Sequence, residues 1–404
     1  TRMEIQTGYA NTDWITAITY THEGRHILTG SNDGIIKQFD AANGREIRTF
    51  PGKNGKIMCL VCSPEGKYII SGSFDGDMKL WDIANGREIR TLHGHRGQIR
   101  SASFSSDGKY AVSGAEDGTL RIWNISSGQW TAYMQNSDNS KWLIFNSDGY
   151  WDSSAAGGDL VAMVSGIDCW NIDQFAVVNN RPDLILSGLP GKDNTFIAHY
   201  KNQYLKRLKK LGFTDSKNNP DEKLVSRDYH VPVSVITSAV TDKKFTEIKY
   251  TLSDSLYNLK RYNIFVNDVP LFGTYGKEIS GTSATLSDKI ELTAGINKIE
   301  VYCMNEKGTE SYRAFITAEY KGKSPKPDLY YIGFGVSKYK NSNLNLGFAD
   351  KDAKDLADLY GSMKGSYGNV YIRTFLNEEV TVENIRNARD LLKNAKPDDT
   401  FVLF

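Results

Sequence analysis

The stretches "ISGSFDGDMKLWD" (Ile70–Asp82) and "VSGAEDGTLRIWN" (Val112–Asn124) share one pattern at a distance of 42 residues (112 − 70). In each, a short alternating run leads into an Asp-Gly pair, and a second run ends at a tryptophan. Asp-Gly between two alternating apolar runs is a strong signal for a tight β-hairpin. The pattern therefore predicts short antiparallel strands that recur along the chain.

The same period covers the first third of the sequence. The repeated markers are turn glycines, Asp-Gly pairs and an aromatic residue at the end of a strand. They are Gly24, Gly66 and Gly108; Asp33, Asp75 and Asp117; Phe39, Trp81 and Trp123; and Gly44, Gly86 and Gly128. Four short strands per period of this length are typical of one β-propeller blade. The two quoted stretches resemble WD repeats, and the resemblance implies an all-β propeller in residues 1–179.

In WD repeats a histidine, a serine or threonine, an aspartate and a tryptophan form a buried hydrogen-bond network. The third repeat carries all four as His95, Ser113, Asp117 and Trp123. The matching histidine position holds Lys53 in the second repeat and Asn11 in the first, and Phe39 replaces the tryptophan in the first. We interpret His95 with Asp117 as part of this structural network and not as a catalytic pair, because buried polar groups need partners.

Two further matches concern the ends of the repeat region. Glu4, Ile5 and Thr7 match Glu46, Ile47 and Thr49 at the same step, which predicts the outer strand of a blade at the start. Either this strand closes the ring or further blades precede it, and we favour the second explanation. Asp148-Gly149 lies 41 residues after Asp107-Gly108, so we also expect a fourth, degenerate blade in "KWLIFNSDGYWDSSAAGGDLVAMVSG" (residues 141–166).

Cys59 and Cys62 lie three residues apart on a predicted strand. Side chains of a strand alternate between faces, so these two thiols point to opposite sides. We expect two packed thiols and neither a zinc site nor a disulfide. With four cysteines in 404 residues there is no disulfide framework, which predicts a reducing, cytoplasmic setting.

Residues 180–227 read as a helical linker. Tyr200, Tyr204, Leu205 and Leu208 have the spacing of one helix face, and "TDSKNNPDEK" (214–223) has the composition of a connecting segment. The helix also carries a basic cluster. Its members are Lys206, Arg207, Lys209 and Lys210. The cluster is either a binding patch or, as we expect, the solvated face of the helix.

Residues 228–321 consist of short β-rich runs bounded by Asn, Asp, Gly and Pro, such as "VPVSVITSAV" and "NKIEVYCMNEKG". The spacing predicts a small immunoglobulin-like β-sandwich. It holds no cluster of a nucleophile and a base, so we expect a spacer or a surface for protein partners.

Residues 322–404 alternate strand and helix: "LYYIGFGVSKY", "ADKDAKDLADLYGSM", "NVYIRTFL", "TVENIRNARDLLKNA" and "TFVLF". Continuously apolar strands joined by helices predict a parallel α/β sheet. Thr381 is the expected N-cap of the second helix, with Asn384 at N3. Gly333-Phe-Gly335 lacks the third glycine of a dinucleotide-binding loop, so we do not interpret it as a phosphate site.

This ordered set is similar to the first half of a caspase-like cysteine peptidase domain, and the domain order is similar to bacterial WD-repeat proteins that end in such a peptidase. The resemblance implies a cysteine endopeptidase with a WD-repeat recognition or regulatory module, in bacterial defence or regulated cell death. It places the catalytic histidine just after Phe404 and the cysteine further on, so no catalytic residue is expected in this chain and we expect it to be inactive alone. "LNLGFADKD" (344–352) holds no arginine where caspases place one for specificity, which argues against cleavage after aspartate and leaves a basic preference open.

The alternative is a non-catalytic WD-repeat scaffold with a structural pseudo-peptidase domain. The partners expected are a protein or peptide substrate and proteins bound by the propeller and the sandwich. The formal net charge of +1 gives no basic footprint for nucleic acid, and no apolar run is long enough to suggest a membrane span. We expect neither a cofactor nor a metal.

Overall fold

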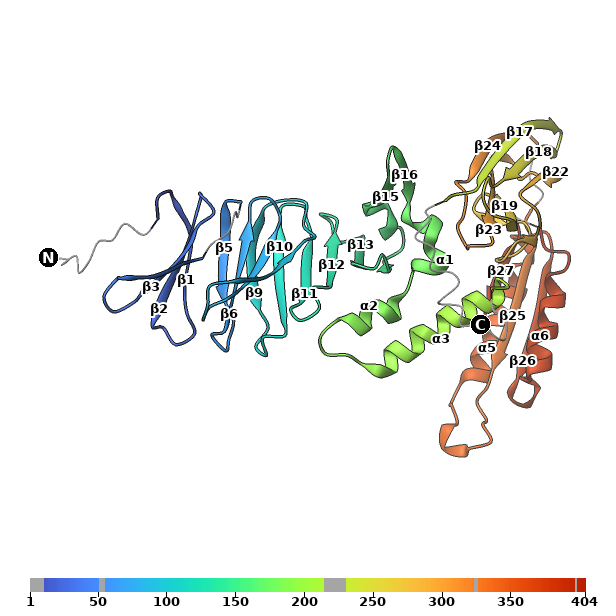
Figure 1. Ribbon diagram of the computed structural model, residues 1–404. Helices are drawn as coiled ribbons and strands as arrows, with labels where there is room; N and C mark the ends of the chain where they lie inside the picture. The colour runs from blue at the N-terminus through green and yellow to red at the C-terminus, as the bar shows by residue number, and fades with distance from the viewer. Residues whose placement is uncertain (1–10, 51–54, 214–229, 323–325, 397) are drawn as a thin grey trace. The chain divides into compact units, whose positions relative to one another are not determined.

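The computed structural model describes residues 11–50, 55–213, 230–322, 326–396 and 398–404 (Figure 1). The predictions on Glu4, Ile5, Thr7 and Lys53 and on the connecting segment 214–223 lie outside these residues. The chain forms two compact units, Thr1–Val231 with Asn305–Glu310 and Pro232–Met304 with Ser311–Phe404. The finer division at residues 179, 227 and 321 stays a prediction.

The first unit begins with three groups of four successive antiparallel strands, which we call blades 1 to 3 (Figure 1). Blade 1 contains β1 (Ile15–Tyr20), β2 (His26–Ser31), β3 (Ile36–Asp40) and β4 (Glu46–Phe50). Blade 2 contains β5 (Ile57–Cys62), β6 (Tyr68–Ser73), β7 (Met78–Asp82) and β8 (Glu88–Leu92). Blade 3 contains β9 (Ile99–Phe104), β10 (Tyr110–Ala115), β11 (Leu120–Asn124) and β12 (Trp130–Gln135). The antiparallel blades predicted from the 42-residue period are present.

Successive blades pack closely because the second strands of blades 1 and 2 each carry a glycine at the contact with the next blade. A Cβ on Gly30 would lie 2.5 Å from Cγ2 of Ile57, and one on Gly72 would lie 2.7 Å from Cγ2 of Ile99. Both isoleucines are fully buried. The small residue on one blade and the branched residue on the next therefore form one interlocking contact, repeated along the stack.

The expected fourth blade is not a separate sheet. β13 (Trp142–Asn146) and β14 (Trp151–Ser153) add to β12 and extend blade 3 to six strands, while β15 (Ala162–Ser165) and β16 (Asp168–Asn171) form a hairpin of their own. The chain turns back after β12 because Asn136 and Lys141 close a hairpin: the backbone N–H of Asn136 donates to the Lys141 carbonyl at 3.1 Å. Asn139 supplies the left-handed residue of this turn, with φ of 60°.

The residue that would lock a fourth blade onto blade 3 is also missing. Lys141 stands where Ile99 stands one period earlier and Ile57 two periods earlier. A Cβ on Gly114, the third glycine of the series, would meet only Oγ of Ser101, at 3.7 Å. The prediction of a separate fourth blade was therefore wrong. It relied on the 41-residue spacing of the Asp-Gly pairs, which locates a turn but does not indicate which strand pairs with which.

Four short helices and one longer helix follow β14 in the described part of the first unit. They are η1 (Gly157–Leu160), η2 (Ile172–Phe175), α1 (Ala176–Asn179), α2 (Pro182–Gly188) and α3 (Asn194–Lys210). Asp193 caps α3 by accepting from the backbone N–H of Thr195 at 2.8 Å.

The predicted stripe on α3 is correct in part. Tyr204 and Leu208 are buried, Leu205 is half-buried, and Tyr200 is exposed. Arg207 departs from the predicted solvated face, because its Nη2 donates to the Asn180 carbonyl at 2.6 Å. Burial lowers the pKa of this guanidinium. The other members of the basic cluster are exposed.

The second unit opens with two antiparallel sheets. One contains β17 (Val233–Asp242), β18 (Phe245–Ser253) and β22 (Ser283–Glu291). The other contains β20 (Val269–Pro270), β19 (Leu259–Val266), β23 (Gly295–Asn305) and β24 (Ala314–Tyr320), with β21 (Lys277–Glu278) paired to β19. Ile248 and Tyr250 of the first sheet and Ile264 and Val301 of the second belong to one buried core. Two sheets share a core as expected, and the immunoglobulin-like assignment stays a prediction.

The remainder is a three-stranded parallel sheet in the order β26-β25-β27, as the alternation of strand and helix predicted. Its elements are β25 (Leu329–Gly335), η3 (Ser342–Leu344), α5 (Ala349–Ser362), η4 (Met363–Gly365), β26 (Val370–Leu376), η5 (Asn377–Glu379), α6 (Val382–Ala388), η6 (Arg389–Leu392) and β27 (Thr400–Leu403). Thr381 caps α6 as expected, accepting from the backbone N–H of Asn384 at 3.1 Å.

The two helices cover opposite faces of this sheet. Tyr331 donates its hydroxyl to the Ala353 carbonyl of α5 at 2.8 Å, whereas the next residue, Ile332, packs with Phe375 and with Ala388 of α6. Consecutive strand residues point to opposite faces, which is why one strand serves both helices. A Cβ on Gly335 would lie 2.4 Å from the Ala349 carbonyl oxygen, so this glycine serves the close approach of α5.

Candidate functional site

One edge of each blade is built by the same backbone hydrogen bond. Asn32 N–H donates to the Trp14 carbonyl at 2.8 Å, Phe74 to Lys56 at 2.8 Å, and Glu116 to Gln98 at 3.0 Å. The donors are 42 residues apart (74 − 32 and 116 − 74), as are the acceptors. We call these six residues the turn edge.

The side chains of the turn edge do not repeat, although its backbone does. Trp14 is 82% exposed and Phe74 is 43% exposed, and the ammonium of Lys56 lies 5.5 Å from the centre of the Phe74 ring. Exposed aromatic side chains are enriched at protein–protein contacts. A constant backbone with variable exposed side chains is what a recognition surface on a repeat scaffold requires.

A buried network holds the turn edge of blade 3 in place. Nδ1 of His95 lies 3.0 Å from Oδ2 of Asp117, and Nε2 lies 2.7 Å from Oγ of Ser113. The indole N–H of Trp123 donates to Oγ of Ser113 at 2.8 Å. Asp117 also accepts from the backbone N–H of Arg96 at 2.9 Å. The network therefore ties the segment entering β9 to the turn between β10 and β11.

The direction of each proton in this network follows from the partners. A carboxylate only accepts, so Nδ1 of His95 carries a hydrogen and neutral Nε2 accepts from the Ser113 hydroxyl. Burial lowers the pKa of His95, although the Asp117 carboxylate opposes that shift. Burial by itself would raise the pKa of Asp117, but hydrogen bonds from Arg96, Thr119 and His95 outweigh it and lower that pKa to about 2. The pair is neutral histidine with ionised aspartate. Ser113 is next to this pair, but it is 2% exposed and its Oγ also accepts from the Trp123 indole, so no substrate can reach it and the network is structural.

Blades 1 and 2 hold their networks with fewer or different members. In blade 1, Asn11 takes the histidine position: its Nδ2 donates to Oγ of Ser31 at 2.8 Å, and its Oδ1 accepts from Thr29 at 2.6 Å. In blade 2, the indole of Trp81 donates to Ser71 at 2.9 Å. In blade 1, where Phe39 offers no N–H to the Thr29 hydroxyl, the Asn11 amide therefore replaces the imidazole.

A second polar cluster lies at the carboxyl ends of β25 and β26, where parallel sheets place their chemistry. Oγ of Ser337 donates to Oδ1 of Asp350 at 2.6 Å, and Nδ2 of Asn377 donates to Oδ2 at 3.0 Å. Hydrogen bonds from Ser337 and then Asn377 lower the pKa of Asp350. Asn377 has a left-handed backbone, with φ of 47°, and its Oδ1 accepts from the backbone N–H of Ser337 and of Lys338, both at 2.9 Å. The three side chains fix the loops that border this edge.

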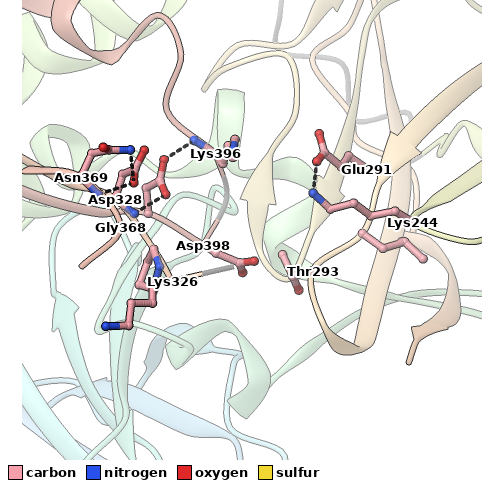
Figure 2. A pocket seen from close by; sticks show the side chains of 12 residues that line it. Lys244, Glu291, Thr293, Lys326, Asp328, Gly368, Asn369, Lys396 and Asp398 are labelled. Atoms are coloured by element: carbon pink, nitrogen blue, oxygen red, sulfur yellow. Dashed lines mark hydrogen bonds and ion pairs between the residues drawn. The ribbon is translucent and has the colours of Figure 1, made fainter. Parts of the chain in front are cut away.

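A cavity of about 250 Å³ lies at the opposite, amino-terminal ends of the parallel strands (Figure 2). Lys244 and Glu291 form an ion pair on one wall. On the other wall, the Asp328 carboxylate accepts a hydrogen bond from the backbone N–H of Asn369 at 2.7 Å. The Asp399 carboxylate accepts one from the backbone N–H of Asp328 at 2.8 Å. These carboxylates hold the strand starts together, so we assign the cavity a structural role.

The cysteines of blade 2 are packed thiols. Burial raises the pKa of Cys59 to about 11 and also raises that of Cys62. A thiol protonated at neutral pH is neither a nucleophile nor a metal ligand. Cys303 is buried on β23, Cys169 is exposed on β16, and His199 lies on α3.

Within the part of the chain that the structure describes, no group of three or more His, Cys, Asp or Glu side chains is placed to hold a metal ion. Among the same residues, no helix has the length and apolar character needed to cross a membrane.

Neither the turn edge nor the Ser337–Asp350–Asn377 cluster is predicted from the sequence. The turn edge has a signal in the sequence, namely exposed aromatic residues at positions where the other markers repeat. The cluster has none, because its members are 13 and 27 residues apart and meet through strand pairing.

Comparison with known proteins agrees with the geometry of the blades. A family model described as "WD domain, G-beta repeat" matches residues 3–40, 44–82 and 86–124. The chain contains three WD40 repeats. Among solved structures, "Crystal structure of RRP9 WD40 repeats" matches at 17% identity and a TM-score of 0.30, over 34% of this chain and 49% of that one. "Structure of U3-55K" matches at 13% identity and a TM-score of 0.29, over 40% of this chain and 70% of that one.

The chain thus spans about half the length of the first of these structures, and neither carries an argument on function. A search of curated proteins found no match. The WD40 assignment therefore rests on the three matched repeats and on the blades themselves.

Proposed function

We propose that this chain is a protein-interaction module whose WD40 repeats present the turn edge to a protein partner. WD40 repeats mediate protein–protein interactions in other proteins. The observation that carries the proposal is the exposure of Trp14 and Phe74 at positions where the backbone repeats and the side chain does not.

The test uses the whole chain as bait, followed by direct measurement. Proteins retained on the immobilised chain are identified and purified, and each is titrated calorimetrically against the chain. The variant Trp14→Ser/Phe74→Ser should lose roughly 2 kcal/mol of binding free energy, or about thirtyfold in affinity, as expected when aromatic anchors are removed.

The repeats offer a matched control. Ile47 and Ile89 occupy one position of the outer strands and are 46% and 48% exposed. The variant Ile47→Ser/Ile89→Ser removes comparable apolar surface away from the turn edge and should bind normally. Normal binding by the turn-edge variant, with loss in the control, would overturn the assignment of the surface.

A second candidate is the caspase-like cysteine peptidase, with the repeats as its recognition or regulatory module. The parallel sheet of β25, β26 and β27 supports this proposal, because such peptidases build their site at the carboxyl ends of a parallel sheet. The Ser337–Asp350–Asn377 cluster lies at that edge and holds its bordering loops. In this proposal the catalytic histidine and cysteine come from residues after Phe404. The protein is proposed to be cytoplasmic.

The peptidase proposal is tested on the protein as its gene encodes it. A series of peptidyl chloromethyl ketones with arginine, lysine or aspartate at the position before the reactive group should label one cysteine and block cleavage of matching fluorogenic peptides. Labelling by the arginine or lysine probe would indicate a basic preference. Absence of labelling by the whole series, with the fold intact, would favour the scaffold with a pseudo-peptidase domain.

A further inference from the structure

Blades 1 and 2 share an ion pair between their third and fourth strands. Lys37 on β3 lies 2.8 Å from Glu46 on β4, and Lys79 on β7 lies 2.8 Å from Glu88 on β8. The cations are 42 residues apart (79 − 37), and so are the glutamates (88 − 46). A cation on this strand is therefore paired with a carboxylate of the same blade.

Blade 3 keeps the cation and lacks the carboxylate. Arg121 stands one period after Lys79, and Trp130 stands one period after Glu88. The guanidinium carbon of Arg121 lies 3.9 Å from the centre of the Trp130 ring. The aromatic face offers a cation–π contact in place of the ion pair, but it accepts no directed hydrogen bond from the edge of the guanidinium.

Arg121 is consequently buried and incompletely satisfied. It is 5% exposed, and its Nη1 has no hydrogen-bond partner. Asp117 lies 3.9 Å from Nη2, and its carboxylate already accepts from His95, Arg96 and Thr119. Burial lowers the pKa of Arg121 to about 10, which leaves it charged at neutral pH. Buried charge without a full set of partners is costly, and a ligand that supplies them relieves that cost.

This guanidinium borders a cavity of about 360 Å³. Its walls combine the two cations Arg96 and Arg121 and the carboxylate of Asp117 with apolar side chains of the extended sheet, including Trp130, Phe145 and Trp151. Gly94 also lines the cavity, and a Cβ there would lie 2.3 Å from Nη1 of Arg121. The glycine therefore provides the space in which Nη1 of Arg121 lies beside the cavity.

We propose that this cavity binds the carboxylate of an aspartate or glutamate side chain of a partner protein, flanked in that partner by apolar residues. The carboxylate pairs with the blade 3 cation, as Glu46 and Glu88 pair with the cations of the other two blades, and the flanking residues pack on the aromatic walls. The Lys–Glu pairs of blades 1 and 2 and the nearby negative charge of Asp117 favour a single carboxylate over a doubly charged phosphate. The inference rests on the proposed interaction function and names the chemistry of the partner.

The test is an array of acetylated pentapeptides with a central glutamate between all pairs of apolar residues, probed with the whole 404-residue chain. Matched arrays carry glutamine or phosphoserine at the centre. The best glutamate peptide should bind about tenfold or more tightly than its glutamine twin, as expected for a hydrogen-bonded charge. Arg121→Met should abolish this preference, and Lys79→Met, the equivalent change in blade 2, should leave it intact.

A variant that gives Arg121 a carboxylate partner within its own blade provides a second test. Trp130→Glu gives Arg121 the glutamate of the other blades and should abolish the preference for glutamate peptides, whereas Trp130→Gln removes the same ring without adding a charge and should retain it. No preference in the unmodified chain, an unchanged preference in Arg121→Met, or a preference for phosphoserine would each overturn the inference. If the array shows no preference while a purified partner still binds the turn edge, the inference is wrong and the interaction function stands.

Discussion

Blade 1 and blade 3 provide hydrogen-bond partners for the buried hydroxyl of their second strand with different residues. Blade 3 joins Trp123, Ser113, His95 and Asp117 in a buried series of hydrogen bonds, whereas blade 1 has Phe39 in place of the tryptophan and Asn11 in place of the histidine. Without an indole N–H, the hydroxyl of Thr29 is satisfied by the Asn11 amide alone.

The comparison shows that the requirement is on hydrogen-bond balance and not on residue identity. Every buried donor and acceptor of the network needs a partner, and two different sets of side chains provide it. Where a change is unbalanced, as at Arg121 beside Trp130, a buried polar group is left over. Such leftover groups are the places at which a repeat can acquire a ligand.

The largest effect is expected at Trp123, which is fully buried. Trp123→Ala should cost about 3–5 kcal/mol of blade stability through the lost packing. Trp123→Phe, which copies Phe39 of blade 1, should cost roughly 1–2 kcal/mol because one donor and part of the volume are lost. Urea unfolding followed by circular dichroism measures both. Equal destabilisation by the two variants would mean that blade 3 does not tolerate phenylalanine at the position that Phe39 occupies in blade 1.

The next effect concerns the contact between blades. Gly72→Ala places a Cβ 2.6 Å from Sγ of Cys59 and 2.7 Å from Cγ2 of Ile99, so it should cost about 1–3 kcal/mol through overpacking. Gly114→Ala is its matched control in blade 3 and should change stability by less than about 0.5 kcal/mol. Thermal unfolding of the two variants checks this. Equal loss in both would mean that the glycine serves its own strand and not the neighbouring blade.

Acidification should affect the His95 network of blade 3 more than a network in which an amide takes the place of the imidazole, as in blade 1. The folded-state pKa of His95 lies below its ordinary value, so the folded chain resists protonation and stability falls as the pH drops through about 6.5. His95→Asn, which copies Asn11, should cost roughly 1 kcal/mol near neutral pH and should show a weaker decline on acidification. Urea midpoints measured across the pH range report the difference. Parallel pH profiles for the two proteins would show that His95 does not contribute to the pH dependence.

The smallest effect is expected for the ion pair between Lys79 and Glu88 in blade 2, which is only partly buried. A double-mutant cycle with Lys79→Met and Glu88→Gln should give a coupling of about 0.2–1 kcal/mol. A much larger coupling would indicate that blade 3 loses substantial stability by carrying Trp130 in place of the glutamate.

Local pattern predicted the elements that depend on local chemistry. The 42-residue period located the strands and turns of all three blades, and the WD-type pattern named His95, Ser113, Asp117 and Trp123. The alternation of apolar strands with helices predicted the parallel sheet, and Thr381 was expected as the cap of α6. Each of these follows from turn residues, side-chain alternation or capping within a few residues of the element concerned.

Features that depend on residues far apart in the chain do not follow from local pattern. Residues 142–153 have the sequence of blade strands, yet they extend blade 3, because the turn closed by Asn136 and Lys141 brings β13 back onto β12. The Ser337–Asp350–Asn377 cluster and the unsatisfied guanidinium of Arg121 likewise exist only once strands have paired. Local residue patterns specify which segments are strands and which residues can form the network. The packed structure determined which edge each strand joins and which polar groups are left without a partner, since both are set by residues far apart in the chain.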